Sequence, residues 1–268
     1  MATWQVWLSG LGAVAAMMVV TWAVSVVRRD ASLVDRVWGL GFVVAAWTYA
    51  VAAGTWHPRT WLVLALVTVW GLRLSGYITV RNWGEGEDAR YQAMRDKRPQ
   101  TFALRSLVTV FLLQALIAWV VSLPLLAATA FDAPAGLIWL DYLAVAVWVV
   151  GFVFEAGGDW QLSRFLADPA NRGKVMDRGL WRYTRHPNYF GDTVVWWSFF
   201  LTALATGAWW TFVGPLLMTV TIVKVSGVAL TDKNMAGKGS TREGYEEYVA
   251  STNAFVPGPR RRRVHSQS

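Results

Sequence analysis

The sequence predicts an all-α polytopic membrane protein with seven transmembrane helices, its N-terminus outside and its C-terminus in the cytoplasm. Of the 268 residues, 55% are apolar and 16% are charged, whereas a water-soluble domain carries about 25% charged residues. The apolar residues gather in runs of roughly twenty, the length that a hydrocarbon core of about 30 Å requires. Cysteine is absent and there are 3 histidines, so disulfides are excluded and a metal site is not expected.

Seven apolar runs define the expected helices. In chain order they cover residues 6–27, 33–53, 60–80, 104–129, 137–157, 187–206 and 208–230. Pro187 suits the first position of a helix, so the sixth run is expected to begin there. A short turn at Thr206 and Gly207 separates the last two runs, which leaves six spans as the alternative. We expect a single membrane domain at 1–257 and a basic, disordered tail at 258–268.

The distribution of cations predicts the orientation, because Lys and Arg in short loops stay on the cytoplasmic side of a membrane. With seven spans, the cations at 28–29, 81–98, 164–185 and in the tail fall on one side, and the other side keeps only Arg59. The net charge of +8 is therefore a topology signal, and no nucleic-acid partner is expected. The basic run at 260–263 is expected to contact anionic membrane lipids. A cationic region does not precede the first run, so a cleaved signal peptide is not expected.

The third run carries polar residues on one helical face. Arg73, Tyr77 and Arg81 are spaced i, i+4 and i+8, so they share that face. An arginine inside an apolar span is costly unless it faces a partner or a wet cavity. The pattern indicates either a functional stripe or arginines that extend to the lipid headgroups.

Acidic residues lie at the ends of two other runs. Asp35, just inside the second run, either caps the helix or acts as a proton donor or orienting partner that faces Tyr77. In the fifth run, Glu155 and Asp159 are four residues apart and repel each other unless cations or ligand donors lie opposite. That pair indicates either a salt-bridge cluster with nearby arginines or hydrogen bonds to a bound ribose or amide.

The stretch RYTRHPNYFGD at 182–192 places many polar groups beside an apolar run. A helix that begins at Pro187 offers free backbone N–H groups, and Arg182 and Arg185 add positive charge, a combination that suits phosphates. Asn188 and Asp192, at i and i+4, continue the polar face. No G-x-G-x-x-G motif after a strand and no P-loop occurs. We therefore expect a ligand site at the cytoplasmic start of this helix.

These residues belong to a longer pattern. GLWRYTRHPNYFGD, preceded by DWQLSRF and followed by KVSG and GYEEYVASTNAFVPGP, resembles the membrane reductases of the steroid 5-alpha-reductase-like family, especially their bacterial relatives. The resemblance extends to SLVDRVWGLGF and WGLRLSGYITVR in the N-terminal half. The R-H-P-x-Y core also occurs in sterol C=C reductases and isoprenylcysteine carboxyl methyltransferases. RHPNY followed by FGD, with DWQ upstream, is more similar to the reductases.

The resemblance implies a seven-helix enzyme that binds NADPH at the cytoplasmic face and reduces a carbon–carbon double bond in a steroid-like or other lipophilic substrate that enters from the bilayer. It implies these cofactor-binding residues: Arg81, Asp159, Asn171, Arg182, Tyr183, Arg185, His186, Asn188, Tyr189, Asp192 and Tyr248. For the catalytic carboxyl and phenol it implies Asp35 and Tyr77, with Tyr91 as the rival of Tyr77. Steroid reductases usually carry Glu at the position of Asp192, so the substrate class stays open.

In the expected reaction, hydride passes from NADPH to the β carbon of an enone, and Tyr77, oriented by Asp35, stabilises the charge on the carbonyl oxygen. The competing class is an S-adenosylmethionine-dependent methyltransferase acting on a lipid-linked substrate. A sulfonium cofactor has no phosphate for Arg182 and Arg185 to bind, which favours the reductase. A non-enzymatic membrane scaffold or lipid-binding protein is the third class.

Overall fold

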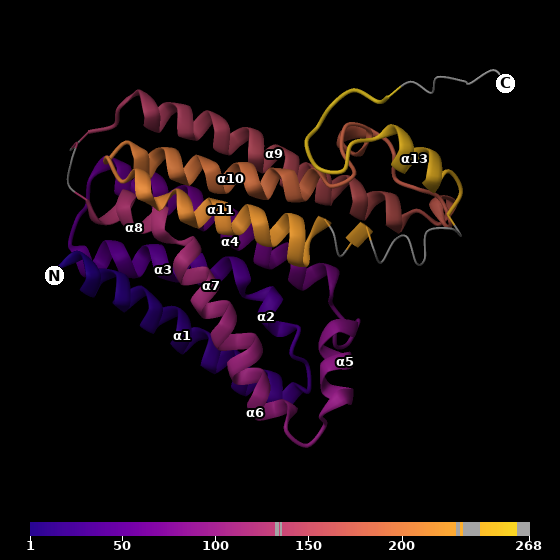
Figure 1. The fold of residues 1–268 in the computed structure, drawn as a ribbon, viewed down its shortest axis with the longest axis horizontal. Coiled ribbons are helices and arrows are strands. Elements are labelled where there is room, and N and C mark those ends of the chain that lie inside the picture. The colour runs from indigo at the N-terminus through magenta and orange to yellow at the C-terminus, as the bar shows by residue number, and fades with distance from the viewer. Residues whose placement is uncertain (132–133, 135, 229–230, 233–241, 262–268) are drawn as a thin grey trace. The chain divides into compact units, whose positions relative to one another are not determined.

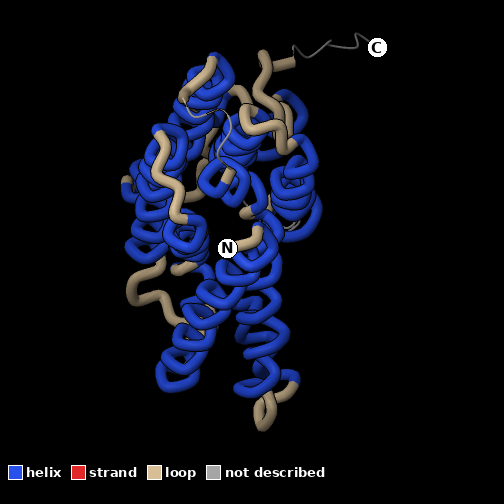
Figure 2. Tube along the Cα trace, turned by 90° about the vertical axis from the view of Figure 1, so that its left-hand side faces the viewer, coloured by secondary structure: helices blue, strands red, loops and turns tan. Residues whose placement is uncertain are grey.

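The structure is a computed structural model that describes residues 1–131, 134, 136–228, 231–232 and 242–261 (Figure 1). Over these residues the regular structure is helical and no strand is formed, although an isolated bridge pairs Lys174 with Glu243. Figure 2 shows the same chain as helices joined by loops. The predicted all-α fold class is confirmed.

The helical elements follow the order of the apolar runs. Their bounds are α1 (Thr3–Arg28), α2 (Leu33–Arg36), α3 (Trp38–Ala53), α4 (Pro58–Arg81), α5 (Ala89–Lys97), α6 (Phe102–Ser106), the π-helical η1 (Leu107–Leu112), α7 (Leu113–Val121), α8 (Leu123–Ala130), α9 (Trp139–Ala167), the 3₁₀-helices η2 (Pro169–Asn171) and η3 (Gly179–Arg182), α10 (Pro187–Leu204), the 3₁₀-helix η4 (Trp209–Phe212), α11 (Val213–Val220), the π-helical η5 (Thr221–Ser226) and α13 (Tyr245–Ser251).

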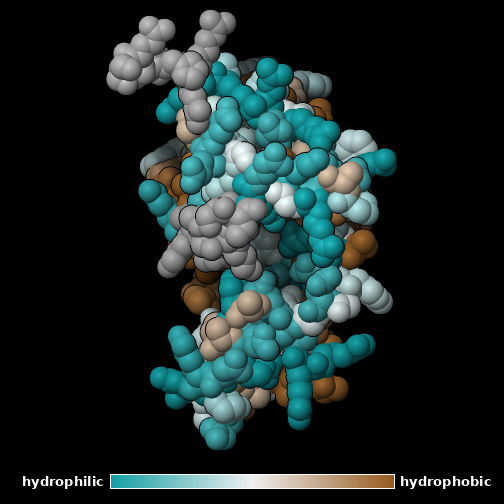
Figure 3. Space-filling model, turned by 90° about the vertical axis from the view of Figure 1, so that its right-hand side faces the viewer, coloured by the Kyte–Doolittle hydropathy of each residue, from teal (hydrophilic) through white to brown (hydrophobic). Residues whose placement is uncertain are grey.

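Within the described residues, 4 helical stretches are long and apolar enough to cross a membrane. They are Thr3–Arg28, Pro58–Arg81, Phe102–Val121 and Trp139–Ala167. Shorter apolar stretches at Trp38–Ala53 and Trp209–Val225 occupy the second and seventh expected runs, and α10 occupies the sixth and begins at Pro187 as predicted. Hydrophilic residues predominate on the molecular face drawn in Figure 3. Apolar helices of these lengths indicate a membrane protein.

Two expected runs are divided in the structure. Residues 33–53 form α2 and α3, which meet at Val37. The run 104–129 is interrupted at Ser122, because Pro124 has no N–H group with which to continue the helical hydrogen bonding. The Ser122 hydroxyl donates to Trp119 O at 2.8 Å and lies 2.8 Å from Tyr49 OH. The polar groups at the break are thereby paired.

The fifth helix is longer than its apolar run. α9 continues to Ala167, beyond residue 157, where the expected run ends. The next helix breaker is Pro169, and a residue that precedes proline avoids the helical conformation. Asp168 is extended there, and its carboxylate accepts a hydrogen bond from Ala170 N at 2.9 Å. The additional turns carry Asp159 within a continuous helix.

The chain forms two compact units, Met1–Tyr142 with Phe199–Gly214 and Leu143–Ser198 with Pro215–Ser268. In the first unit, α3 packs against α1, α4 and α8. Gly39 and Gly71 allow α3 and α4 to approach closely, since a Cβ on Gly39 would lie 2.7 Å from Gly71 O. Small residues of this kind are common where helices of membrane proteins meet.

In the second unit, the backbones of α9 and α10 are in contact. A Cβ on Gly151 would lie 2.7 Å from Val195 N, and one on Gly158 would lie 3.1 Å from Asn188 N. The close approach at Gly158 brings the C-terminal part of α9 to the beginning of α10. The polar stretch that starts α10 is thereby placed beside Asp159.

Arg59 is buried, although the sequence suggested only a loop cation. Its side chain is 2% exposed, and its Nε and Nη2 atoms donate to the two carboxylate oxygens of Asp141 at 2.7 and 2.8 Å. The carbonyl oxygens of Pro134 and Gly136 accept from Arg59 Nη1 and Nη2, each at 3.0 Å. Arg59 therefore joins the first turn of α4 to the first turn of α9 within the first unit.

Of the basic run at 260–263, Arg260 and Arg261 lie within the described residues, and the other two positions lie outside them. Arg260 Nη2 donates to Asp177 Oδ2 at 2.8 Å. Arg261 N donates to Ser251 O at 2.9 Å. These two arginines therefore contact the protein itself.

Candidate functional site

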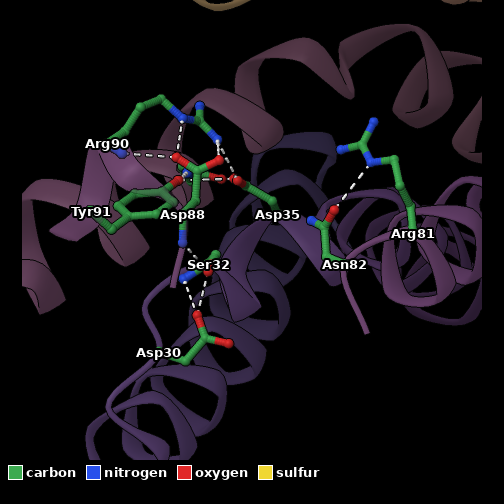
Figure 4. Close-up of polar contacts among 9 residues, drawn as sticks. Asp30, Ser32, Asp35, Arg81, Asn82, Asp88, Arg90 and Tyr91 are labelled. Atoms are coloured by element: carbon green, nitrogen blue, oxygen red, sulfur yellow. Dashed lines mark hydrogen bonds and ion pairs between the residues drawn. The ribbon is translucent and has the colours of Figure 1, made fainter. Parts of the chain in front are cut away.

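The first candidate group, in the first unit, is a carboxylate with a phenol and a guanidinium bound to it (Figure 4). Tyr91 OH donates to Asp35 Oδ1 at 2.9 Å, and Arg90 Nη2 donates to Asp35 Oδ2 at 2.8 Å. Arg90 Nε also donates to Asp88 Oδ1 at 2.9 Å. Tyr91 is buried, with 6% of its surface exposed. Asp35 is thus paired through both oxygens and does not serve as a helix cap.

The register of two chain segments brings this pair together. Residues 31–35 and 87–91 run side by side and are joined by hydrogen bonds between residues 56 positions apart. Ala31 N donates to Glu87 Oε1 at 2.8 Å, Asp88 N donates to Ser32 Oγ at 3.1 Å, and Tyr91 OH donates to Asp35 Oδ1 at 2.9 Å. Two backbone donors are therefore satisfied by the same alignment that delivers the phenol to the carboxylate.

The phenol is held in its protonated form. Burial raises the pKa of Tyr91, and the neighbouring Asp35 carboxylate raises it further. Gln114 Nε2 donates a long hydrogen bond to Tyr91 OH at 3.4 Å. Gln114 is the second residue of α7, directly after the π-helical η1, and π-helical turns often adjust side chains at functional sites. Tyr91 is therefore a proton donor whose oxygen also accepts.

Tyr77, the phenol that we paired with Asp35 from the sequence, has different neighbours. The guanidinium groups of Arg73 and Arg81 each lie 5.4 Å from the centroid of its ring, a cation–π arrangement. The three residues share one face of α4, as their spacing predicts. In the structure the phenol bonded to Asp35 is that of the rival residue, Tyr91. The pairing of residues 31–35 with residues 87–91 places α5, and not the Tyr77 face of α4, beside the Asp35 carboxylate.

Glu87 stabilises the pairing of residues 31–35 with residues 87–91. Arg95 donates from Nη2 to Glu87 Oε1 at 2.7 Å and from Nε to Glu87 Oε2 at 2.8 Å. Burial alone would raise the pKa of Glu87, but the hydrogen bonds from Arg95 and Ala31 outweigh burial and lower it below 4.5. The carboxylate therefore stabilises the fold fully above pH 4.5, and the stabilisation is lost as the pH falls through the lowered pKa of the folded state.

The Glu87→Gln variant is expected to show a smaller decrease in melting temperature than the natural protein between pH 5 and pH 3, a window that is about one unit either side of the ordinary pKa. The amide cannot be protonated and so loses no ionic partner in acid. Thermal unfolding followed by circular dichroism in detergent measures this dependence. Glu85→Gln, an exposed position in the same loop, is the matched control, and an equally flattened profile in that variant would contradict the assignment.

The second candidate group lies in the second unit, where the stretch 182–192 begins α10. Asn188 Nδ2 donates to Asp159 Oδ1 at 3.0 Å, and Asp159 is buried. Among the residues that the structure describes, Asn188 Oδ1 and Arg185 Nε are buried and have no hydrogen-bond partner. Buried polar atoms without partners are uncommon in folded proteins, so they indicate an interaction that a ligand would complete.

Arg185 and His186 share one carboxylate. Arg185 Nη2 donates to Asp232 Oδ2 at 2.7 Å, and His186 Nε2 lies 2.9 Å from Asp232 Oδ1. The rings of His186 and Tyr189 are stacked, with centroids 5.5 Å apart and planes at 22°. Tyr189 OH lies 3.3 Å from Thr231 Oγ1. The polar stretch is thereby fixed to the segment that follows the last apolar helix.

The C-terminal segment covers the beginning of the polar stretch. Tyr248 OH, on α13, donates to Trp181 O at 2.7 Å. Thr184 Oγ1 donates to Phe255 O at 2.8 Å, and Gly258 N donates to Tyr183 O at 3.0 Å. Burial raises the pKa of Tyr248, which keeps its phenol a donor. These hydrogen bonds fix the C-terminal segment to the beginning of the polar stretch.

The remaining expected cofactor residues are more dispersed. Arg182 and Tyr183 are exposed, and Asp192 lies one helical turn after Asn188. Asn171 Nδ2 donates to Phe165 O at 3.0 Å, and its Oδ1 accepts from Arg178 Nη2 at 3.3 Å, so these bonds stabilise the loop after α9. Arg81, in the first unit, ends α4 and donates to Asn82 Oδ1 at 3.1 Å.

Sequence reasoning missed three residues of these groups: Arg90, Gln114 and Asp232. Gln114 is the single amide in a run whose other polar residues are Arg105 and four hydroxyl residues, and a polar residue in a mostly apolar run is itself a signal. Arg90 lies on α5 among other charged residues, and Asp232 follows the last apolar run; in neither case does the sequence around the residue indicate its partner. Within the described residues, no cluster of three or more metal-ligating side chains occurs.

Comparison with known proteins gives a family without an assigned activity. Residues 21–252 match a family model described as a protein of unknown function, DUF1295. The chain belongs to this family. A curated relative, an uncharacterized protein of Schizosaccharomyces pombe, is 27% identical over 207 residues, which cover 68% of this chain and 60% of the relative. The chain thus spans about three fifths of the length of the curated relative that it matches. No solved structure matches this DUF1295 protein.

Proposed function

We propose that this DUF1295 protein is a membrane reductase of the steroid 5-alpha-reductase-like type, which uses NADPH to reduce a carbon–carbon double bond conjugated to a carbonyl in a lipophilic substrate. The observation that carries the proposal is the buried Tyr91 phenol bonded to Asp35 at 2.9 Å. A carboxyl-oriented phenol is a donor suited to a carbonyl oxygen that gains negative charge. The carbonyl carries the polar recognition, and the rest of the substrate is apolar.

The residues that start α10 fit a phosphate- and amide-bearing cofactor. Two of the buried atoms that have no hydrogen-bond partner within the described residues are Asn188 Oδ1, an acceptor suited to a carboxamide, and Arg185 Nε, a donor suited to a phosphate. Asn188, Asp159 and Tyr189 would hold the nicotinamide and ribose, and Arg182, Arg185 and His186 would hold the phosphates. NADPH, when bound, supplies the hydride.

The residues of the first unit supply the acid chemistry. In the proposed reaction the one O–H of Tyr91 turns from Asp35 Oδ1 to the substrate carbonyl oxygen and stabilises the developing enolate, and Asp35 keeps Arg90 as its partner. Gln114 Nε2 donates to the phenol oxygen of Tyr91. The phenol proton therefore points away from Gln114 and toward an acceptor. Arg90 balances the charge of Asp35 at 2.8 Å.

The proposal includes the finer topology that the sequence predicts: seven spans in a bacterial inner membrane, the N-terminus outside, and both candidate groups on the cytoplasmic side. Arg28, Arg29 and Arg81 follow the ends of apolar helices, and Arg90, Arg95 and Lys97 lie on α5. Their common side supports this orientation by the positive-inside rule. The substrate enters from the bilayer, and membrane lipids are the surrounding partners.

NADPH is expected to raise the melting temperature of the purified protein in detergent, because a ligand that binds only the folded state stabilises it by about 2.7 kcal/mol at one hundred times its dissociation constant. NADH and S-adenosylmethionine are measured beside it. Asn188→Ala is expected to weaken the NADPH effect, while Gln92→Ala, an exposed amide on α5, leaves it unchanged. Stabilisation by S-adenosylmethionine alone would favour the methyltransferase class and contradict the proposed reductase function.

A further inference from the structure

Arg185 and His186 both bind the carboxylate of Asp232. The reductase proposal does not explain the role of this carboxylate. The two oxygens of Asp232 are used separately, one for Arg185 Nη2 at 2.7 Å and the other for His186 Nε2 at 2.9 Å. One carboxylate therefore spans two donors on consecutive residues. Two oxygens of a phosphate group can be held in the same way, since guanidinium groups bind carboxylates and phosphates with similar geometry.

The two donors are positioned by contacts that do not involve Asp232. Arg185 N donates to Asn253 O at 2.9 Å, and Arg185 Nη1 donates to Val249 O at 3.1 Å. The His186 ring is stacked on Tyr189, and His186 N donates to Thr184 Oγ1 at 3.3 Å. Backbone carbonyls and a hydroxyl carry no net charge. The donors would consequently keep their places, with their charge uncompensated by these contacts, if Asp232 were removed.

The three side chains of this cluster differ in their exposure to solvent. The side chain of Asp232 is 32% exposed, whereas those of Arg185 and His186 are 14% and 4% exposed. The carboxylate is thus the most exposed of the three side chains. In addition, Arg185 Nε is buried without a hydrogen-bond partner among the described residues, so the guanidinium has donor capacity that Asp232 does not use.

Asp232 is ionised at neutral pH. Burial alone would raise its pKa, but the hydrogen bonds and charges of His186 and Arg185 outweigh burial and lower the pKa below the ordinary 3.8. A phosphate that approaches Arg185 and His186 therefore meets a negative charge already in place. It must either displace that carboxylate or bind beside it against electrostatic repulsion.

We propose that Asp232 is an internal counter-anion that occupies an oxyanion-binding site formed by Arg185 and His186, and that a phosphate group of a ligand takes its place. The identification of that ligand as a phosphorylated dinucleotide rests on the proposed reductase function. The site itself is defined by the three side chains. Asp232 thus sets the affinity of the site for phosphate-bearing ligands.

The test measures the binding of inorganic pyrophosphate and, separately, of NADPH to the full-length protein in detergent, by tryptophan fluorescence. Asp232→Asn keeps the size of the side chain and removes its charge. This variant is expected to bind pyrophosphate on the order of tenfold more tightly than the natural protein. Asp232→Glu restores the charge and is expected to bind at the natural level or more weakly.

Asp177→Asn is the matched control, because Asp177 also pairs with an arginine at 2.8 Å, but that arginine is Arg260 and the carboxylate is 49% exposed. It should leave pyrophosphate binding unchanged. Unchanged or weaker pyrophosphate binding by a folded Asp232→Asn variant overturns the proposal and makes Asp232 a structural partner only.

A measurement on the natural protein covers the case in which Asp232→Asn does not fold. With ¹³C-labelled aspartate, the infrared difference spectrum on addition of pyrophosphate should show a shifted carboxylate band, and no shift overturns the proposal. The NADPH arm separates the two hypotheses. Tighter pyrophosphate binding without any NADPH binding supports the oxyanion site and rejects the reductase, whereas NADPH binding that Asp232→Asn leaves unaltered supports the reductase and rejects the role of Asp232.

Discussion

Replacing Tyr91 with phenylalanine is expected to lower the turnover of an enone substrate by about two to three orders of magnitude, the effect of removing one donor from an oxyanion site. The ring remains, so the packing of this buried residue is kept. Asp35 keeps Arg90 as its partner at 2.8 Å, so no isolated charge is left. NADPH binding should be unaffected, because the residues proposed to hold the cofactor phosphates belong to the second unit and Tyr91 belongs to the first.

The measurement is the rate of NADPH oxidation at saturating cofactor, together with product mass. Tyr142→Phe, which removes the hydroxyl of an exposed tyrosine of the first unit, is the matched control and should retain full turnover. Tyr77→Phe decides between the two phenols. A large loss in Tyr77→Phe with full turnover in Tyr91→Phe would return the catalytic role to the residue chosen from the sequence.

Replacing Arg59 with methionine is expected to destabilise the protein by about 3–5 kcal/mol, the cost of removing one partner from a buried ion pair. The variant leaves Asp141, which is 0% exposed on its side chain, without its two guanidinium hydrogen bonds. It also leaves the carbonyl oxygens of Pro134 and Gly136 without a donor. Chemical unfolding in mixed micelles, followed by helical circular dichroism, measures the loss.

The double variant Arg59→Met with Asp141→Leu separates the ion pair from its surroundings. Removal of both charges is expected to cost less than either single substitution, because no uncompensated charge remains. Arg98→Met, at an exposed cation after α5, is the control for loss of an arginine in general. Additive losses in the double variant would show that the two side chains do not stabilise the fold as a pair.

Much of the helical plan could be predicted from local sequence. Proline at position 187 begins α10, and Gly207, with φ of +81°, forms the turn after it, since these backbone preferences belong to the residues themselves. The interruption of the helix at Ser122 and the extension of α9 to Ala167 were missed. The length of an apolar run shows that a helix can cross a membrane. It does not show where the helix is interrupted within the membrane or how far it continues beyond it.

The candidate groups were predictable by residue type and not by partner. The polar stretch 182–192 could be recognised because its groups lie close together in the chain. Asp35 was identified as well, and its phenol was left between Tyr77, which was preferred, and Tyr91, because that choice depends on the pairing of segments 56 residues apart. Asp232 lies 46 residues from His186, and no local pattern links the two.

The sequence by itself thus determined the helical class, the apolar runs and the polar stretch at the beginning of α10, because hydrophobicity, proline and glycine act over neighbouring residues. The tertiary structure alone decided that Tyr91 binds Asp35, that Asp232 binds Arg185 and His186, and that Arg59 is buried against Asp141. Each of these contacts joins residues distant in the chain. Such contacts form only when packing pairs one segment with another, a choice that depends on the whole chain and that no short stretch contains.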